Sequence, residues 1–296
     1  MPEYEIRELQ KQLKVYADGR YVAAVQQGKF RPYVYPLFTP AGHNVLQIAP
    51  ADHLHHLGIF FSHSAVSAER DRGSQPGTDQ TSTAVDFWSA ETFQVGPLPQ
   101  ILVRATDTAV TERGVEFDQA IEWIDGDGGL VVRERRITTI AAGPQGNTVD
   151  LVTTLEAPGN PVILGQAKDA GIGVRVADQI DVVDGGRIVN ANGQENEAET
   201  FGQVSAWVDY SGPATPETTA GVAVFLYPDA RVIPWHTRDY GPMWINPWQH
   251  APMTLAVGET YTIGAHCVAH DGSCEAAGVA GLYATFQEEL RAWAPT

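Results

Sequence analysis

Hydrophobic and polar residues alternate along much of this chain. Between 115 and 124 the apolar side chains fall on one side of an extended backbone and the acidic ones on the other, as in a half-buried strand. Similar alternation or short apolar runs recur, bounded by turn sequences such as 17–20 and 125–129, which contain Asp-Gly. These patterns predict strands at 4–25 (as a hairpin), 33–38, 101–111, 115–124, 130–140, 149–156, 204–210, 221–227 and 261–269, with short apolar runs at 45–48 and 57–61.

Only the last segment of the chain has the period of a helix. From about 278 to 293 the apolar residues recur every three or four positions, as Val279, Leu282, Tyr283 and Phe286 illustrate. No sequence repeat and no change of composition marks a linker. We therefore predict one all-β domain over 1–296, built as a large antiparallel β-sandwich with one C-terminal helix.

Composition narrows the classes of partner. The 296 residues are 43% hydrophobic, which is enough for a large core. The formal net charge is −17, and such an acidic surface repels nucleic-acid phosphates and anionic membranes. We expect neither nucleic acid nor a membrane as a partner. Association of the chain with further copies of itself as a homo-oligomer stays open.

The N-terminal segment and the cysteines favour a cytoplasmic location. The first residues are charged and lack the apolar region of a signal peptide, and no apolar run approaches the roughly 20 residues needed to cross a bilayer. Cys267 and Cys274 could form one disulfide, but two thiols in a chain this long are more typical of an intracellular protein.

A long polar segment rich in Gly and Ser occupies 62–83. Loops of this length inside a compact domain are usually functional or disordered. Two interpretations stay open: a lid over a nearby site, or plain disorder.

Five of the nine histidines precede or begin this segment, namely His43, His53, His55, His56 and His63. In an extended backbone, His53 and His55 would point to one side and His56 to the other. Such a His-x-His pair can hold a divalent metal ion, with a third ligand from His43, His63 or Asp86. The alternatives are metal-free acid–base chemistry by an imidazole, or histidines hydrogen-bonded at a bend.

The residues after the polar segment, Asp86, Phe87 and Trp88, combine a carboxylate with two aromatic rings. Asp86 could orient a histidine or bind a sugar hydroxyl, and Trp88 could stack on a sugar face. An equally good interpretation is that ordinary core aromatics return to a strand here.

A second cluster of aromatic and polar residues covers 231–250. Aromatic platforms with interleaved hydrogen-bonding groups suit carbohydrates, which present apolar C–H faces and a rim of hydroxyls. Pro234, Pro242 and Pro247 favour loops rather than strands here. We hypothesise that this stretch forms the wall opposite the histidines, the alternative being a Trp-rich corner of the core. Its notable residues are Trp235, His236, Arg238, Asp239, Tyr240, Trp244, Asn246 and Trp248.

Several other classes lack their signatures. There is no Gly-x-Ser-x-Gly elbow, no P-loop and no dinucleotide fingerprint. The glycine-rich stretch 165–175 lacks phosphate-loop spacing. The Asp-x-Asp-Gly at 125–128 lacks the later ligands of a calcium loop, so we interpret it as a turn.

The arrangement of these motifs resembles the DUF6807 family, whose members are often labelled "PmoA-like". That label should not be transferred, because the methane monooxygenase subunit of that name is an integral membrane protein. The chain departs from the family pattern at Leu54, where proline is common, and at Leu57, where a basic residue is common. The segment between His63 and Val85 is also longer. The matching stretches are 31–42, 52–63, 85–88, 207–212, 221–223 and 235–241.

The resemblance implies a sugar or modified-sugar substrate, because family members tend to occur with sugar oxidoreductases. A supersandwich like that of aldose epimerases and polysaccharide lyases is the fold we expect by analogy. We select as catalytic candidates His53, His55, His56, Asp86, His236, Arg238 and Asp239, and as substrate-binding candidates His43, His63, Trp88, Lys168, Trp235, Tyr240 and Asn246.

Three functions are carried forward. The first is an enzyme that hydrolyses or β-eliminates a glycoside or an oxidised (keto) sugar, with a histidine as base and Arg238 stabilising an enolate. The second is a non-catalytic carbohydrate-binding subunit that works with a sugar oxidoreductase. The third is a metal-dependent oxygenase. One divalent metal ion, held by His53 and His55, is the cofactor that the sequence suggests.

Overall fold

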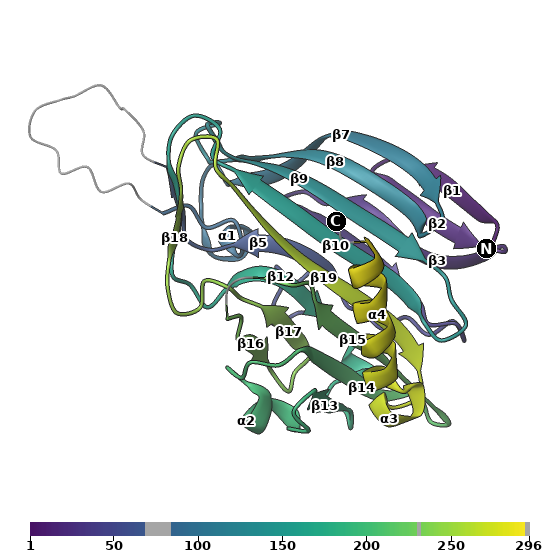
Figure 1. Ribbon diagram of the computed structural model, residues 1–296. Coiled ribbons are helices and arrows are strands. Elements are labelled where there is room, and N and C mark those ends of the chain that lie inside the picture. Colours follow the sequence, from purple (N-terminus) through teal and green to yellow (C-terminus); the bar gives the residue numbers. More distant parts are fainter. Residues whose placement is uncertain (69–83, 230–231, 294–296) are drawn as a thin grey trace, which may run out of the picture.

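Two large antiparallel sheets packed face to face form the protein, as the computed structural model shows (Figure 1). The structure describes residues 1–68, 84–229 and 232–293. The first sheet has the strand order β1-β2-β3-β4-β5-β12-β17-β16. Its strands are β1 (Tyr4–Leu9), β2 (Gln12–Ala17), β3 (Arg20–Gln27), β4 (Pro32–Leu37), β5 (Ile59–His63), β12 (Ala170–Arg175), β17 (Pro242–Ile245) and β16 (Trp235–Thr237).

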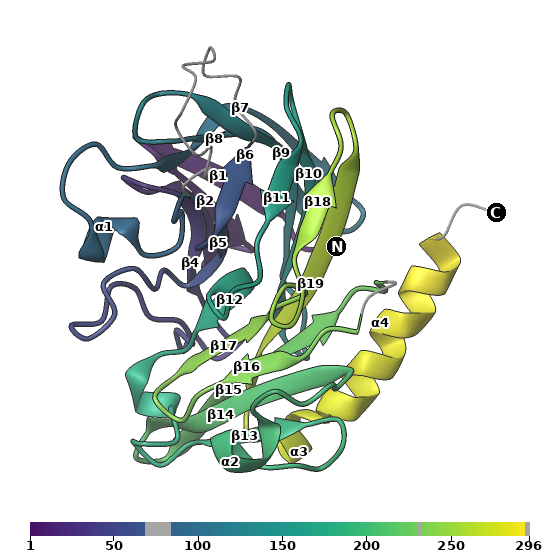
Figure 2. The same cartoon turned by 90° about the vertical axis from the view of Figure 1, so that its left-hand side faces the viewer.

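The second sheet has the order β13-β14-β15-β19-β10-β9-β8-β7. A third, three-stranded sheet has the order β18-β11-β6 and flanks the two large ones (Figure 2). These strands are β13 (Arg187–Asn190), β14 (Trp207–Thr215), β15 (Thr218–Leu226), β19 (Thr260–Asp271), β10 (Asn147–Glu156), β9 (Leu130–Ala141), β8 (Gly114–Ile124), β7 (Gln100–Thr111), β18 (Met253–Leu255), β11 (Val162–Leu164) and β6 (Val66–Ala68).

The helices lie outside the sandwich. The helix α4 (Val279–Trp293) packs Val279 and Phe286 on the outer face of the second sheet, against Phe225 and Val268. The short α1 (Ala90–Phe93) lies on the opposite side of the molecule (Figure 2). The remaining helical turns are α2 (Asn196–Thr200), α3 (Cys274–Ala277) and the 3₁₀ turn η1 (Asp178–Ile180).

The predicted all-β sandwich with a C-terminal helix is confirmed. The alternation in β8 follows the burial of its side chains, since Val115, Phe117, Ile121 and Trp123 all face the core. Both cysteines are buried free thiols. No helix within the described ranges is long and apolar enough to span a membrane.

Some local predictions were wrong. Val66–Ala68, within the segment expected to be a loop, pairs with β11, and residues 69–83 of that segment lie outside the described residues. The apolar run 45–48 forms isolated bridges. The prolines at 234 and 242 do not prevent strands, because Pro234 directly precedes β16 and Pro242 is the first residue of β17. Proline is tolerated at the first position of a strand.

A buried ion pair lies between the two large sheets. The Glu134 carboxylate accepts hydrogen bonds from Arg136 Nε at 2.6 Å, Thr153 Oγ1 at 2.6 Å and Trp123 Nε1 at 2.7 Å. Arg136 Nη1 also donates to the Pro32 carbonyl in the facing sheet at 3.3 Å. The pair therefore connects β8, β9 and β10 with β4.

Removing one partner of this pair should destabilise the fold strongly. Glu134→Ala leaves the Arg136 charge buried without its counter-ion, so we expect a loss of about 3–5 kcal/mol in the free energy of unfolding. Glu122→Ala removes a partly exposed ion pair with Arg104 and should cost less than about 1 kcal/mol. Urea denaturation measures both, and equal losses would show that the buried pair is not a tie between the sheets.

Candidate functional site

The histidine cluster lies on a tight turn, not on the extended backbone that a His-x-His pair on one face would need. The amide of His53 donates to the Pro50 carbonyl at 3.0 Å, and the amide of His56 donates to the His53 carbonyl at 2.9 Å. A turn of this kind brings its first and fourth residues together. The rings of His53 and His56 therefore stack, with centroids 4.6 Å apart and planes 13° from parallel, instead of facing opposite sides.

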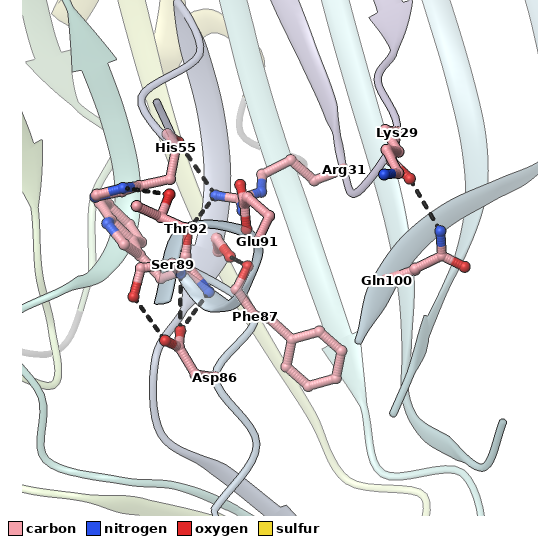
Figure 3. A network of polar contacts seen from close by, with 11 residues as sticks. Lys29, Arg31, His55, Asp86, Phe87, Ser89, Glu91, Thr92 and Gln100 are labelled. Atoms are coloured by element: carbon pink, nitrogen blue, oxygen red, sulfur yellow. Dashed lines mark hydrogen bonds and ion pairs between the residues drawn. The ribbon is translucent and has the colours of Figure 1, made fainter. Parts of the chain in front are cut away.

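A fully buried arginine holds this turn in place. Arg31 Nη1 donates to the carbonyl of His55 at 3.3 Å and to the carbonyl of Trp88 at 2.6 Å (Figure 3). Its Nη2 forms an ion pair with Glu91 of α1. One side chain thus joins the start of β4, the histidine turn and the segment that contains α1.

Asp86 fixes the entry into α1 rather than a histidine. Among the described residues its carboxylate accepts from the Trp88 amide at 2.8 Å, the Ser89 amide at 2.9 Å and Ser89 Oγ at 2.6 Å (Figure 3). The carboxylate that contacts an imidazole here is Asp52, whose Oδ2 lies 2.7 Å from His53 Nδ1. The expected orienting role therefore fits Asp52 better than Asp86.

The histidines continue into a row of aromatic rings, which we call the aromatic row. It links the histidine turn to the β16–β17 hairpin and to the loop after α2. Consecutive ring centroids are 5.9, 4.6, 5.7, 4.0 and 5.0 Å apart. The members in spatial order are Phe93, His55, His56, Trp244, His236 and Phe201.

The inner imidazoles of the row are electrically neutral near pH 7. Burial lowers the pKa of His55 to about 4, of His56 to about 2 and of His236 to about 3, and neighbouring positive charges such as Arg31 and Arg238 lower these values further. The Nδ1 atoms of His56 and His236 and the Nε1 atom of Trp88 are buried without a hydrogen-bond partner in the described part of the chain. Buried polar atoms normally have a partner, so these atoms favour a bound water or ligand.

Charged groups and a tyrosine line the other side of the histidine turn. The Tyr240 ring stacks on His53 at 5.0 Å and contacts the guanidinium groups of Arg175 and Arg238 at 5.5 and 5.7 Å. Arg238 also pairs with Glu197 at 3.2 Å. The structure therefore brings six of the candidates together, namely His53, His55, His56, His236, Arg238 and Tyr240.

Two tryptophans that we expected to stack on a ligand are buried. Trp235 has no exposed surface, and its Nε1 donates to the Ser205 carbonyl at 2.8 Å. Trp88 is equally buried, packing on Phe60 and Trp244 below the aromatic row. Neither offers a ring face to a ligand in this structure, which corrects the expectation for both.

Other candidates have structural contacts. Asn246 is buried and binds the carbonyls of Ala167 and Lys168. Asp239 accepts from the amide of Glu197 at 2.9 Å, which ties β16 to α2. The side chain of Lys168 is exposed and lies 3.8 Å from Asp169.

Two predicted histidines lie outside the cluster. His43 contacts Thr218 at the β14–β15 turn, 3.3 Å away. His63 is fully buried in β5, where it packs on Trp248 and accepts from the Ala65 amide at 3.0 Å. Neither ring is in contact with the histidine turn among the ring contacts of the described residues.

The predicted metal site at His53 and His55 has no third ligand among the described residues. Within residues 1–68, 84–229 and 232–293, no group of three or more His, Cys, Asp or Glu side chains is placed to hold a metal ion. His53 and His55, whose rings are 5.7 Å apart, stay a predicted two-histidine pair.

Sequence reasoning overlooked four charged residues of this site: Arg31, Glu91, Asp169 and Arg175. Burial raises the pKa of Asp169, which lies close enough to His53 and Asp86 for their charges to act on it. Arg31 and Arg175 are buried charges, and nothing in their sequence neighbourhood distinguishes them from surface arginines. Only the position of Arg31 inside the matching motif 31–42 could have drawn attention to it.

Substitution of Arg31 should be among the most damaging changes in this region. Arg31→Met leaves the Glu91 carboxylate and two carbonyls without their partner, so we expect a loss of about 3–5 kcal/mol in the free energy of unfolding. Glu91→Gln keeps an acceptor and should cost less. As a control, Arg135→Met removes the exposed pair with Asp118 and should cost less than about 1 kcal/mol. Equal effects of Arg31→Met and Arg135→Met in urea denaturation would contradict the anchoring role.

Stability should fall as the pH decreases below about 6.5. Burial lowers the pKa of His55, His56, His63 and His236 to about 4, 2, 3 and 3, so the unfolded chain binds protons that the folded chain does not. Each should cost roughly 1 kcal/mol per pH unit between about pH 6.5 and 4.

His270 contributes with the opposite sign. Burial opposes its charge, but the Asp209 carboxylate 2.6 Å away raises its pKa, so its stabilisation is present below about pH 6.5 and is lost as the pH rises through the folded pKa. Urea midpoints from pH 7 to 5 measure the net effect. His56→Gln and His236→Gln should flatten the slope, whereas the surface variant His250→Gln should retain it; an unchanged slope in all three would refute the assignment.

Comparison with known proteins places the chain in a family. A search of curated proteins finds no match. Similar solved structures include galactose 1-epimerase from Lactobacillus acidophilus NCFM, with a TM-score of 0.39, 6% identity, and 92% of this chain and 100% of that chain covered. A polysaccharide lyase matches with a TM-score of 0.36 and 12% identity over 92% of this chain and 33% of that chain. The family model described as "Family of unknown function (DUF6807)" matches residues 12–284, so the chain belongs to the DUF6807 family.

Proposed function

We propose that this protein is a carbohydrate-active enzyme that cleaves the glycosidic carbon–oxygen bond of a glycoside or keto-glycoside. The observation that carries the proposal is the dyad of His53 and Asp52, with 2.7 Å between Nδ1 and Oδ2. A carboxylate on Nδ1 orients the ring and leaves Nε2 as the atom that exchanges a proton with a substrate. The side chain of His53 is 31% exposed, whereas His55 and His56 are buried.

The charge of Asp52 suits this role. Partial burial opposes its ionisation, but the hydrogen bond and charge of His53 lower the pKa of Asp52 below its usual range. Asp52 therefore stays ionised at neutral pH, when it can stabilise the imidazolium that forms as His53 accepts a proton.

Two reactions use such a base. In hydrolysis, His53 takes a proton from water as the water attacks the anomeric carbon, the bond from that carbon to the aglycone oxygen breaks, and the aglycone leaves as an alcohol after its oxygen takes a proton from solvent. In β-elimination, it takes a proton from the carbon next to a ketone, and Arg238 stabilises the enolate that forms before the glycosidic oxygen leaves. Arg238 is 5.7 Å from the Tyr240 ring that stacks on His53, which supports a role for both near the reacting atoms.

The neutral imidazoles support binding rather than proton transfer. With pKa values of about 2 and 3, His56 and His236 stay uncharged at neutral pH and can each donate one hydrogen bond and accept another. Sugar hydroxyls have the same dual capacity, and their C–H faces suit aromatic rings.

The second candidate function is carbohydrate binding without catalysis. The low pKa values of the buried imidazoles favour it, because His55, His56 and His236 are too weakly basic to act as general bases efficiently at pH 7. The two functions differ in their dependence on the dyad: binding through the row does not need a proton acceptor at His53.

Variants of the dyad separate the two functions. We expect the parent protein to release the aglycone from a panel of glycosides and their 3-keto derivatives, measured by chromatography. His53→Gln and Asp52→Asn should reduce kcat by about 100-fold or more, because general base catalysis typically contributes 10²–10⁴-fold, while the Kd for a substrate analogue changes little.

The matched control is His250→Gln, which replaces an exposed histidine outside the site. It should retain both turnover and binding. Binding without turnover of any panel member by the parent would favour the non-catalytic function. Full turnover by His53→Gln would show that another group is the base.

A further inference from the structure

The two ends of the aromatic row are exposed. Phe93 is 73% exposed and Phe201 is 40% exposed, and they are the exposed phenylalanines of the described residues. The first lies 5.9 Å from the ring of His55 and the second 5.0 Å from the ring of His236. Exposed apolar side chains that lie together mark a binding surface more often than singly scattered ones do.

The end of the row at Phe93 is apolar. Leu54, which is 54% exposed, lies in the histidine turn directly before His55, and the exposed Val95 follows two residues after Phe93. The charged residue nearest in sequence, Glu91, is already paired with the buried Arg31. This end therefore presents apolar surface without an available charge from α1.

The end of the row at Phe201 is polar. The Arg238 guanidinium lies 5.7 Å from the Phe201 ring and pairs with Glu197 at 3.2 Å. Arg238 also contacts Tyr240, which stacks on His53 of the proposed catalytic dyad. A ligand that lies along the row thus meets hydrogen-bonding groups at one end and apolar groups at the other.

We infer that the substrate is a glycoside with an aromatic aglycone, which binds against Phe93 and Leu54 while its sugar lies between His53 and Arg238. This inference rests on the proposed function and names its substrate class. An aromatic ring gains from burial of its apolar faces and from edge or offset contacts with Phe93. A free sugar or an alkyl glycoside would leave this end of the row exposed.

Binding of matched probes tests the inference. Isothermal titration calorimetry compares 4-nitrophenyl β-D-glucoside with methyl β-D-glucoside, and the corresponding pair of galactosides, at fixed pH. We expect the aryl glycoside to bind about tenfold more tightly, the gain that aromatic contacts and apolar burial typically give. Phe93→Ser and Leu54→Ser should each remove much of this preference, because they weaken binding of the aryl glycoside more than binding of the methyl glycoside.

The chain offers closely matched controls. Leu9 is 54% exposed, as is Leu54, and it lies on β1; Val183 is 72% exposed, close to the value for Phe93, and follows η1. Leu9→Ser and Val183→Ser remove apolar side chains of nearly the same fractional exposure outside the row. Both should keep the aryl preference of the parent protein.

The remaining outcomes are distinguishable. Equal affinity for aryl and methyl glycosides, or equal loss of both in Phe93→Ser, would overturn the inference and leave the proposed function standing. No binding of any probe would overturn the inference, whereas the proposed function is decided separately by turnover of the glycoside and 3-keto-glycoside panel. Sedimentation of each variant provides the last check: if Phe93→Ser dissociates an oligomer and leaves probe binding unchanged, the apolar end is a contact between copies of the chain and the inference fails.

Discussion

The candidate site depends on one buried positive charge. Arg31 is fully buried, so its guanidinium must be compensated inside the protein, and it finds its acceptors in three chain segments: the carbonyl of His55, the carbonyl of Trp88 and the carboxylate of Glu91. A guanidinium offers several donors in a fixed plane, which is why it can join three segments at defined angles where a lysine could not. The histidine turn and α1 have few regular hydrogen bonds of their own. The Arg31 guanidinium, whose charge must be compensated by their acceptors, therefore also fixes their positions. The charge has a second effect, because it lowers the pKa of His55 beyond what burial does.

Burial divides the histidines by task. Those inside the aromatic row are held neutral and suit hydrogen bonding, whereas His53 is partly exposed, paired with Asp52 and stacked between His56 and Tyr240. The division arises from a turn of four residues, in which the first side chain lies at the surface and the fourth inside. A His-x-His pair on a strand would instead have given two equivalent rings on one face.

The sequence was sufficient for the fold class, because alternation of apolar and polar residues follows directly from a strand with one buried face. Prediction from the sequence failed for strands that do not have one buried and one exposed face. All six residues of β12 are buried, and its one alanine and two glycines hide the alternation of apolar and polar positions. Near β16 and β17 the prolines suggested loops, although Pro234 directly precedes β16 and Pro242 begins β17. Most residues of the candidate cluster could be selected from the sequence because histidine, arginine and tyrosine are conspicuous there. Their contacts could not be predicted in the same way. Asp86 and Asp52 are both acidic residues near aromatic ones, and only the three-dimensional contacts of Asp86 with Trp88 and Ser89 show which of them is free to contact His53.

The site is also a place where the fold gives up stability. Buried atoms without a partner in the described part of the chain, such as His56 Nδ1, His236 Nδ1 and Trp88 Nε1, each cost about 1–3 kcal/mol relative to a hydrogen-bonded group. A structural role alone would favour apolar residues of the same shape at these positions, which would remove the cost. Among the described residues, such atoms also occur away from the row, for example His63 Nε2 and Trp248 Nε1. The orphaned atoms of the row therefore acquire meaning only together with its exposed neighbour His53, the one imidazole of the histidine turn that a ligand can reach without opening the core.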